Sequence, residues 1–171
     1  MVPVSVVRIC RADYADPVHA QALVSVLDAY ALDPMGGGEP LSAFARLNLV
    51  QALADRPQAF SVLAFDDASC SSEPQPIGLV NCIEGFSTFA CRPLVNVHDV
   101  AVISTYRGRG VGEKMLKLVE QIAHERGACK LTLEVLQGNS GAARLYHRIG
   151  FADYQLDANS GSATFMQKWL S

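Results

Sequence analysis

The amino-acid sequence predicts an α/β domain built around a mixed β-sheet. Strand-like and helical stretches follow one another along the chain in the order β-α-α-β-β-β-α-β-α-β-β. Half of the 171 residues are hydrophobic and 18% are charged, so the chain can bury a sizeable core. A glycine-rich turn over residues 107–112 joins a β-branched strand to a long amphipathic helix. With no internal repeat and no long linker, we expect a single domain over residues 1–171.

The first elements are predicted from local signals. Alternation favours a strand over residues 4–10. Asp16 before a proline is typical of a helix start, and the helix is expected to run to about residue 31. A second helix is expected over residues 42–54, and a strand over residues 59–65. The Gly-Gly-Gly loop between these helices has no strand before it, so a flexible connection is favoured over a second phosphate site.

The central elements follow a polar loop. A strand is expected over residues 77–83, and residues 84–93 are expected to be less regular. Residues 95–103 are rich in β-branched side chains and predict the central strand. Apolar residues at helical spacing then predict a helix that ends near Gly127.

The last third predicts three more elements. Residues 130–135 alternate as a strand, and residues 139–150 predict a short helix. Residues 151–156 and 162–170, with a turn between them, predict a closing hairpin.

The composition argues against several classes of partner and location. A net charge of −3 gives no basic field for nucleic acid, so we expect no nucleic-acid partner. No apolar run approaches about twenty residues, and the first residues lack the features of a signal peptide, so we expect no membrane association. Five cysteines without a paired CxxC pattern favour reduced thiols and no metal site. These features indicate a cytoplasmic protein.

The turn at residues 107–112 has the composition of an anion site. Gly108, Gly110 and Gly112 stand at alternate positions where the strand gives way to the helix. Glycine permits positive φ and close approach of a ligand, and the first N–H groups of a helix carry partial positive charge. A phosphate or pyrophosphate suits such a site. The spacing fits neither the dinucleotide fingerprint nor the nucleoside-triphosphate P-loop, and a turn that only connects two elements is the alternative.

Two motifs resemble one known family. Arg107-x-x-Gly110-x-Gly112 resembles the acyl-CoA pyrophosphate loop of the GCN5-related N-acetyltransferase (GNAT) family. Residues 133–139 (Leu-Glu-Val-x-x-x-Asn) and 142–151, which contain Leu-Tyr and end in Gly-Phe, resemble the C-terminal motif of the same family. The resemblance implies a GNAT-like α/β fold, with a mixed sheet of about seven strands and about four helices.

The resemblance also implies direct transfer of an acetyl group from acetyl-CoA to an amine. The pantetheine arm would pair with the central strand, and a backbone N–H near Val100 would stabilise the developing oxyanion. Tyr146 aligns with the acid that protonates the leaving thiolate, with core packing as the alternative. Asn139 would bind pantetheine or only cap a helix. The expected cofactor-binding residues are Val100, Ala101, Val102, Arg107, Gly108, Arg109, Gly110, Val111, Gly112, Glu113, Asn139 and Tyr146.

Acceptor binding is expected beside the central strand. Residues 86–89 and 96–99 resemble the diamine and polyamine acetyltransferase branch, in which a Glu-Asp pair precedes the acetyl position. Here His98 stands in place of that glutamate, and Asp99 follows it. Because side chains alternate along a strand, His98 and Asp99 are expected to lie on opposite faces of the sheet. His98 is a candidate base or a structural histidine. Glu84 is a second candidate base or amine anchor, with a solvated strand end as the alternative, and Glu39 would add negative charge at the acceptor entrance.

The expected function is therefore acetylation of a primary amine on a small molecule, either diamine-like or amino-acid-like. Acetylation of a protein or peptide is the alternative within the same chemistry. A non-catalytic module that senses acyl-CoA is the alternative outside it. The family resemblance also implies a homodimer.

Overall fold

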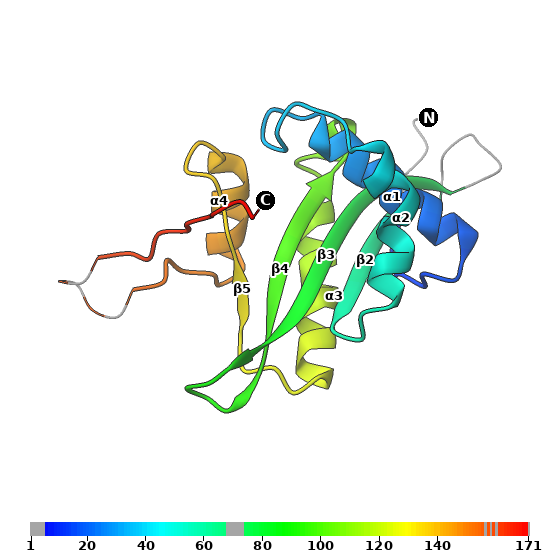
Figure 1. Ribbon diagram of the computed structural model, residues 1–171. Helices are drawn as coiled ribbons and strands as arrows, with labels where there is room; N and C mark the ends of the chain where they lie inside the picture. Colours follow the sequence, from blue (N-terminus) through cyan, green and yellow to red (C-terminus); the bar gives the residue numbers. More distant parts are fainter. Residues whose placement is uncertain (1–5, 68–73, 156, 158, 160, 171) are drawn as a thin grey trace. The chain divides into compact units, whose positions relative to one another are not determined.

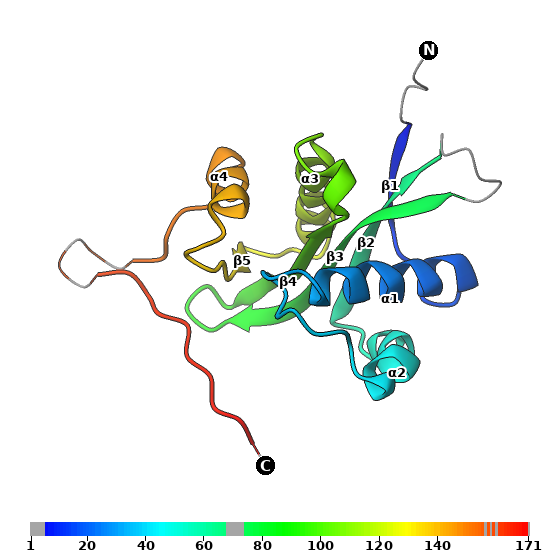
Figure 2. The ribbon, with the colours of Figure 1, turned by 90° about the horizontal axis from the view of Figure 1, so that it is seen from above.

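The chain folds as two compact units, Met1–Leu133 and Glu134–Ser171. The computed structural model describes residues 6–67, 74–155, 157, 159 and 161–170. The first unit holds a five-stranded sheet whose strands lie in the order β1-β2-β3-β4-β5 (Figure 1 and Figure 2). The four strands β1 to β4 are antiparallel, and β5 pairs in parallel with β4, so the predicted mixed sheet is confirmed. The strands are β1 Val7–Arg11, β2 Ala59–Asp66, β3 Gln75–Ser87, β4 Arg92–Val102 and β5 Leu131–Leu133.

Helices cover both faces of this sheet. Helices α1 (Pro17–Ala31) and α2 (Ala43–Ala54) lie on one face, and α3 (Val111–Glu125) lies on the other (Figure 2). A 3-10 turn, η1 (Ser104–Tyr106), leads from β4 toward α3. Asp16 caps α1 by accepting the Val18 N–H at 2.8 Å, which confirms the predicted helix start.

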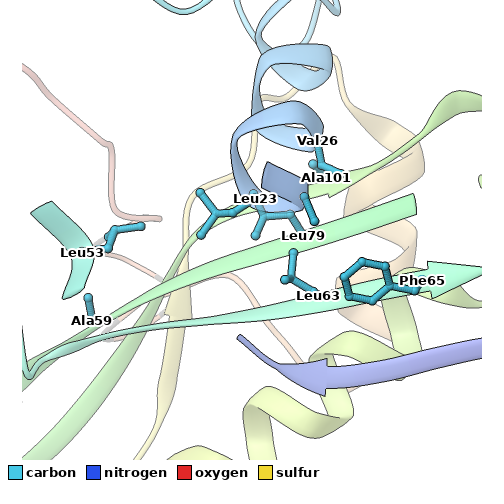
Figure 3. Packing of buried hydrophobic residues seen from close by; sticks show 9 residues of the cluster. Leu23, Val26, Leu53, Ala59, Leu63, Phe65, Leu79 and Ala101 are labelled. Atoms are coloured by element: carbon cyan, nitrogen blue, oxygen red, sulfur yellow. The ribbon is translucent and has the colours of Figure 1, made fainter. Parts of the chain in front are cut away.

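The core on the α1 side explains why the strands are apolar. Leu23 and Val26 of α1 pack against Leu63 of β2 and Leu79 of β3 (Figure 3). All four side chains are at most 1% exposed. Burying each contributes about 1.5–3 kcal/mol to folding.

On the other face, Met115 of α3 packs over β3 beside Gly78. A Cβ on Gly78 would lie 2.8 Å from Met115 Cε, so glycine makes room for this contact.

The hairpin between β3 and β4 is more regular than predicted. The prediction that residues 84–93 are irregular is wrong, because β3 continues to Ser87 and pairs with β4 from Arg92 onward. The turn between them is closed by Cys91 at a φ of 49°. Ladder pairing to a neighbouring strand keeps these residues extended, which their own composition does not indicate.

The second unit confirms one prediction and corrects another. Helix α4 (Ser140–Arg148) forms where predicted, and Gly150, with a φ of 101°, ends it. The prediction that the chain closes with a hairpin of two strands is wrong, because the described residues of this segment form only an isolated bridge between Gln155 and Ser162. Residues 156, 158 and 160 of that hairpin lie outside the described residues.

The sheet therefore has five strands in the described part of the chain, where about seven were expected. A strand is stabilised by burying one of its faces, yet Phe165 is 70% and Trp169 is 87% exposed. Strand β5 is also shorter than the predicted 130–135. No helix in the described residues is long and apolar enough to span a membrane.

Replacing a core leucine tests this packing. We expect Leu63→Ala to lower the free energy of unfolding by about 3 kcal/mol, because it leaves a cavity under α1. Leu47→Ala is the control, since Leu47 on α2 is 84% exposed; its effect should stay below about 0.5 kcal/mol. Urea unfolding measures both, and equal effects would contradict this description of the core.

Candidate active site

The glycine turn has a backbone conformation that only glycine adopts easily. Gly108 and Gly110 have φ values of 74° and 78°. A Cβ on either would meet nothing within 4 Å, so the requirement comes from φ and the space beside the turn is open. Gly110 is the N-cap of α3 and has no side chain of its own to cap the helix. An anion can bond the N–H groups of such a first turn, which fits a pyrophosphate.

Arg107 joins three segments at this turn. Its Nη2 lies 2.8 Å from Asp33 Oδ2, in the loop that follows α1, and its Nε donates to the Val102 carbonyl at 3.0 Å. The Met35 N–H and then the Arg107 guanidinium hold the pKa of Asp33 below its usual value. Sequence reasoning placed Arg107 among the cofactor ligands and missed this ion pair, which joins residues 74 positions apart.

The neighbouring charged residues make local contacts. The guanidinium of Arg109 lies 5.2 Å from the centre of the Tyr106 ring. Glu113, in the first turn of α3, pairs with Lys117 at 3.0 Å.

One edge of β4 opens beside the turn. Strand β5 pairs only with Val95–Val97, so within the described residues β4 has no strand partner on that side beyond Val97. The Ile103 N–H donates to the Ile77 carbonyl of β3. Along an antiparallel strand, successive residues direct their N–H and C=O groups alternately to one side of the strand and to the other. Val100 and Val102 therefore direct their N–H and C=O groups away from β3; on that side the Val102 C=O accepts from Arg107 Nε, and the Val100 N–H and C=O and the Val102 N–H face the open edge. A ligand with peptide-like amides can pair there as an added strand.

A β-bulge in β4 lies at His98. Asp99 pairs with Asn81 and Val97 pairs with Cys82, so His98 has no opposite residue in β3. Val97 and Asp99 consequently lie on opposite faces of the sheet, whereas unbroken alternation would place them on the same face. The predicted separation of His98 and Asp99 assumed such alternation, which the bulge interrupts. His98 is exposed, and Asp99 is half-buried.

Asp99 lies on the α1 face of the sheet, in a polar environment. The Asn81 amide donates to its Oδ2 at 3.0 Å. Burial, and then the charges of Asp99 and Asp33, raise the pKa of Tyr30 at the end of α1. The phenol of Tyr30 and the carboxylates of Asp33 and Asp99 thus lie in the first unit, at the same end of the sheet as the glycine turn.

Glu84 does not lie near the glycine turn or Asp99. Alternation puts it on the α3 face with Cys82, and its Oε2 lies 3.0 Å from Arg126 Nη1. Arg126 is the C-cap of α3, so Glu84 lies about 22 Å along that 15-residue helix from Gly110. Glu39 is exposed in the loop between α1 and α2.

The second unit positions Asn139 and Tyr146. Asn139 Oδ1 accepts the Ala142 N–H at 3.2 Å, so this side chain caps α4. The Tyr146 ring is 8% exposed and meets the Phe151 ring edge-on, with centroids 5.9 Å apart. Burial of Tyr146 agrees with a packing role.

No metal site is indicated in the described residues, and two of the cysteines there are protonated thiols. No three His, Cys, Asp or Glu side chains among them are grouped so that they could hold a metal ion. Burial raises the pKa of Cys82 to about 12, and burial also raises that of Cys10, so both remain thiols at neutral pH.

Comparison with known proteins gives one family match. The model of a family described as the acetyltransferase (GNAT) family matches residues 24–151. Thialysine N-epsilon-acetyltransferase of Bos taurus is 32% identical over 97 residues, which cover 55% of this chain and 56% of that protein. Streptothricin acetyltransferase of Streptomyces lavendulae is 38% identical over 64 residues, covering 37% of this chain and 34% of that protein. The chain thus spans about a third to just over half of the length of these relatives.

A solved structure shows the same fold. The crystal structure of a probable acetyltransferase superposes with a TM-score of 0.73 at 21% identity, over 94% of this chain and 99% of that one.

The Arg107–Asp33 pair can be tested by titration. In Arg107→Ala the pKa of Asp33 should rise toward its ordinary value, and only in part, because the Met35 N–H bond remains. The ion pair therefore stabilises the fold above the usual Asp pKa, and that contribution is lost as pH falls through the lowered one. NMR titration of the Asp33 carboxyl carbon measures the shift. Arg109→Ala is the matched control, and equal pKa values in both variants would refute the assignment.

Proposed function

Since the chain belongs to the acetyltransferase (GNAT) family, we propose that it is an acetyl-CoA-dependent N-acetyltransferase acting on a primary amine of a small molecule. The observation that carries this proposal is the pairing of an anion site with an open strand edge in one unit. Gly108 and Gly110, with their positive φ values, form the anion site, and Val100 and Val102 form the open strand edge.

Cofactor binding follows from this geometry. The N–H groups of residues 108–112 bind the pyrophosphate, with the positive end of α3 behind them. The Val100 C=O and the Val102 N–H pair with the amides of the pantetheine arm, since the Val102 C=O already accepts from Arg107. Acetyl-CoA supplies the thioester. The Val100 N–H donates to the thioester oxygen as negative charge develops there.

The transfer then needs three proton movements. The ammonium gives up one proton to His98, and the neutral nitrogen forms a bond to the acetyl carbon. The C–S bond breaks, the leaving thiolate takes the proton of the Tyr146 hydroxyl, and the tyrosinate takes the second proton that the nitrogen loses as the amide forms. Because His98 lies on the bulge and is exposed, it returns its proton to water between turnovers.

The acceptor class follows from charge. Asp99 is a carboxylate whose charge acts on Tyr30, and it favours a cationic amine over an anionic one. The relatives named for thialysine and streptothricin support a small molecule as acceptor. Asp99 serves as the amine anchor. Glu84 is already paired with Arg126, and Glu39 adds only exposed negative charge beside the loop.

Three parts of the proposal rest on the family resemblance and composition. These are a single catalytic domain over the whole chain, a homodimer, and a cytoplasmic location. The family match across residues 24–151, which includes residues of both compact units, supports the first of them.

Gly110→Ala tests the cofactor site. An alanine at a φ of 78° strains the turn and moves the first N–H groups of α3, so we expect acetyl-CoA to bind about tenfold more weakly. Gly138→Ala is the control, because a Cβ there also meets nothing within 4 Å and Gly138 does not have a positive φ. Calorimetry gives both dissociation constants. Unchanged affinity in Gly110→Ala would remove the turn from the cofactor site.

Tyr146→Phe tests the reaction. We expect release of CoA thiol with at least one member of a panel of diamines, amino acids, aminoglycosides and short peptides. The rate should fall about 100-fold or more in Tyr146→Phe, because the leaving thiolate loses its acid. Tyr154→Phe, at a 62% exposed tyrosine of the same unit, should keep the wild-type rate.

The same panel separates the alternatives. Turnover of peptides alone would favour a protein or peptide acceptor. Binding of acetyl-CoA without turnover of any amine would favour the sensor module. Equal rates in wild type and Tyr146→Phe would leave the hydroxyl with no role in the transfer.

A further inference from the structure

A row of polar side chains crosses the α1 face of the sheet. Ser61 of β2 and Asn81 of β3 are cross-strand partners, and Asn81 is in turn the partner of Asp99 of β4. Ser61 is 0% and Asn81 is 4% exposed. The neighbouring positions of the same face, Leu63 and Leu79, are apolar and buried.

These side chains form one continuous hydrogen-bonded chain with a fixed direction. The Ser61 hydroxyl donates to Asn81 Oδ1 at 2.6 Å, and Asn81 Nδ2 donates to Asp99 Oδ2 at 3.0 Å. Tyr14 lies 2.9 Å from the same Ser61 oxygen. Because Ser61 has one proton and gives it to Asn81, the Tyr14 hydroxyl must be the donor to Ser61. Every donor in the chain thus points toward the Asp99 carboxylate.

Such a row is costly unless each member is satisfied. Burying an unpaired hydroxyl or amide costs about 1–3 kcal/mol, and apolar side chains would fill this face without that risk. No buried side-chain nitrogen or oxygen lacks a partner in the described part of the chain. The arrangement is therefore complete, and its one partly exposed carboxylate is Asp99.

The chain orients Asp99 and does not conduct protons to it. A proton relay requires each member to accept one proton and release another, and the Asn81 amide nitrogen has no lone pair available to accept one. Asn81 instead holds Oδ2 in place, which leaves Oδ1 of Asp99 for a ligand.

We infer that Tyr14, Ser61 and Asn81 are positioning residues that hold the Asp99 carboxylate against the acceptor ammonium group. This inference rests on the proposed function. It predicts that damage to the chain weakens amine binding while acetyl-CoA binding is unaffected.

Steady-state kinetics tests the inference, with the amine that gives the fastest CoA release in the panel above as the probe. The KM for the amine should rise about tenfold in Asn81→Leu, less in Ser61→Ala and least in Tyr14→Phe, in order of distance from Asp99. The KM for acetyl-CoA should not change. Ser61→Thr keeps a hydroxyl at the same place and should retain the wild-type KM for the amine.

Two controls separate positioning from general damage. Asn96→Leu removes another amide of β4, which bonds Thr132 of β5, and Ser25→Ala removes a hydroxyl that bonds the Ala22 carbonyl in α1. Both should leave the KM for the amine unchanged. Thermal unfolding of each variant shows that it is folded, and if Asn81→Leu is not, the nearly isosteric Ser61→Ala and Tyr14→Phe decide.

A double-mutant cycle tests whether the chain acts through Asp99. In an Asp99→Asn background, Ser61→Ala should add nothing to the KM for the amine. Additive effects, or an unchanged KM in folded Ser61→Ala and Tyr14→Phe, would overturn the inference while transfer by the wild type continues. Absence of transfer by the wild type would instead refute the proposed function.

Discussion

The bulge at His98 is the constraint on which the arrangement of the site depends. One extra residue in β4 changes which face each later side chain occupies. Before the bulge, Val97 lies on the α3 face; after it, Asp99 and Ala101 lie on the α1 face. The pairing of β4 with β5 also stops at Val97, one residue before the bulge. The same point in the strand therefore places the carboxylate on one face and opens the edge that accepts an added strand.

The glycine turn is tied to this strand by Arg107. Its bond to the Val102 carbonyl fixes the distance between the end of β4 and the start of α3, and its ion pair adds the loop after α1. An exposed ion pair contributes little to stability. Its effect is geometric, because two loops and a strand end share one guanidinium. The glycine turn and the loop that follows α1 are therefore linked within the first unit.

The sequence predicts those features that depend on neighbouring residues. Asp16 followed by proline predicts the start of α1, and Gly110 predicts the turn before α3, because caps and positive φ are local properties. The bulge, the Asn81–Asp99 bond and the Arg107–Asp33 pair join residues far apart in the sequence, so no local pattern indicates them. A buried serine and asparagine in apolar strands were a possible signal for the polar row, although which residues they face depends on the register.

The failed hairpin has a different cause. Residues 162–170 have a strand-like pattern, and such a pattern forms a strand only where another layer covers its apolar side. In the described residues of the second unit, Phe165 and Trp169 remain exposed and only one bridge forms. Glu84 is a second case in which a local pattern did not predict the position of a residue. Its place at the end of an apolar run made it a candidate for the site, and alternation put it on the other face, against Arg126.

The two carboxylates near Tyr30 differ in what holds them, and this difference bears on the acceptor. Asp33 is held by a cation, Arg107, so its charge is largely cancelled before any substrate arrives. Asp99 is held by a neutral amide, Asn81, which fixes one oxygen and leaves the negative charge in place. An arginine at position 81 would orient the carboxylate equally well and would compete with an ammonium for it. A chain of neutral donors is therefore the arrangement suited to a carboxylate that must be both fixed in direction and free to attract a cationic amine.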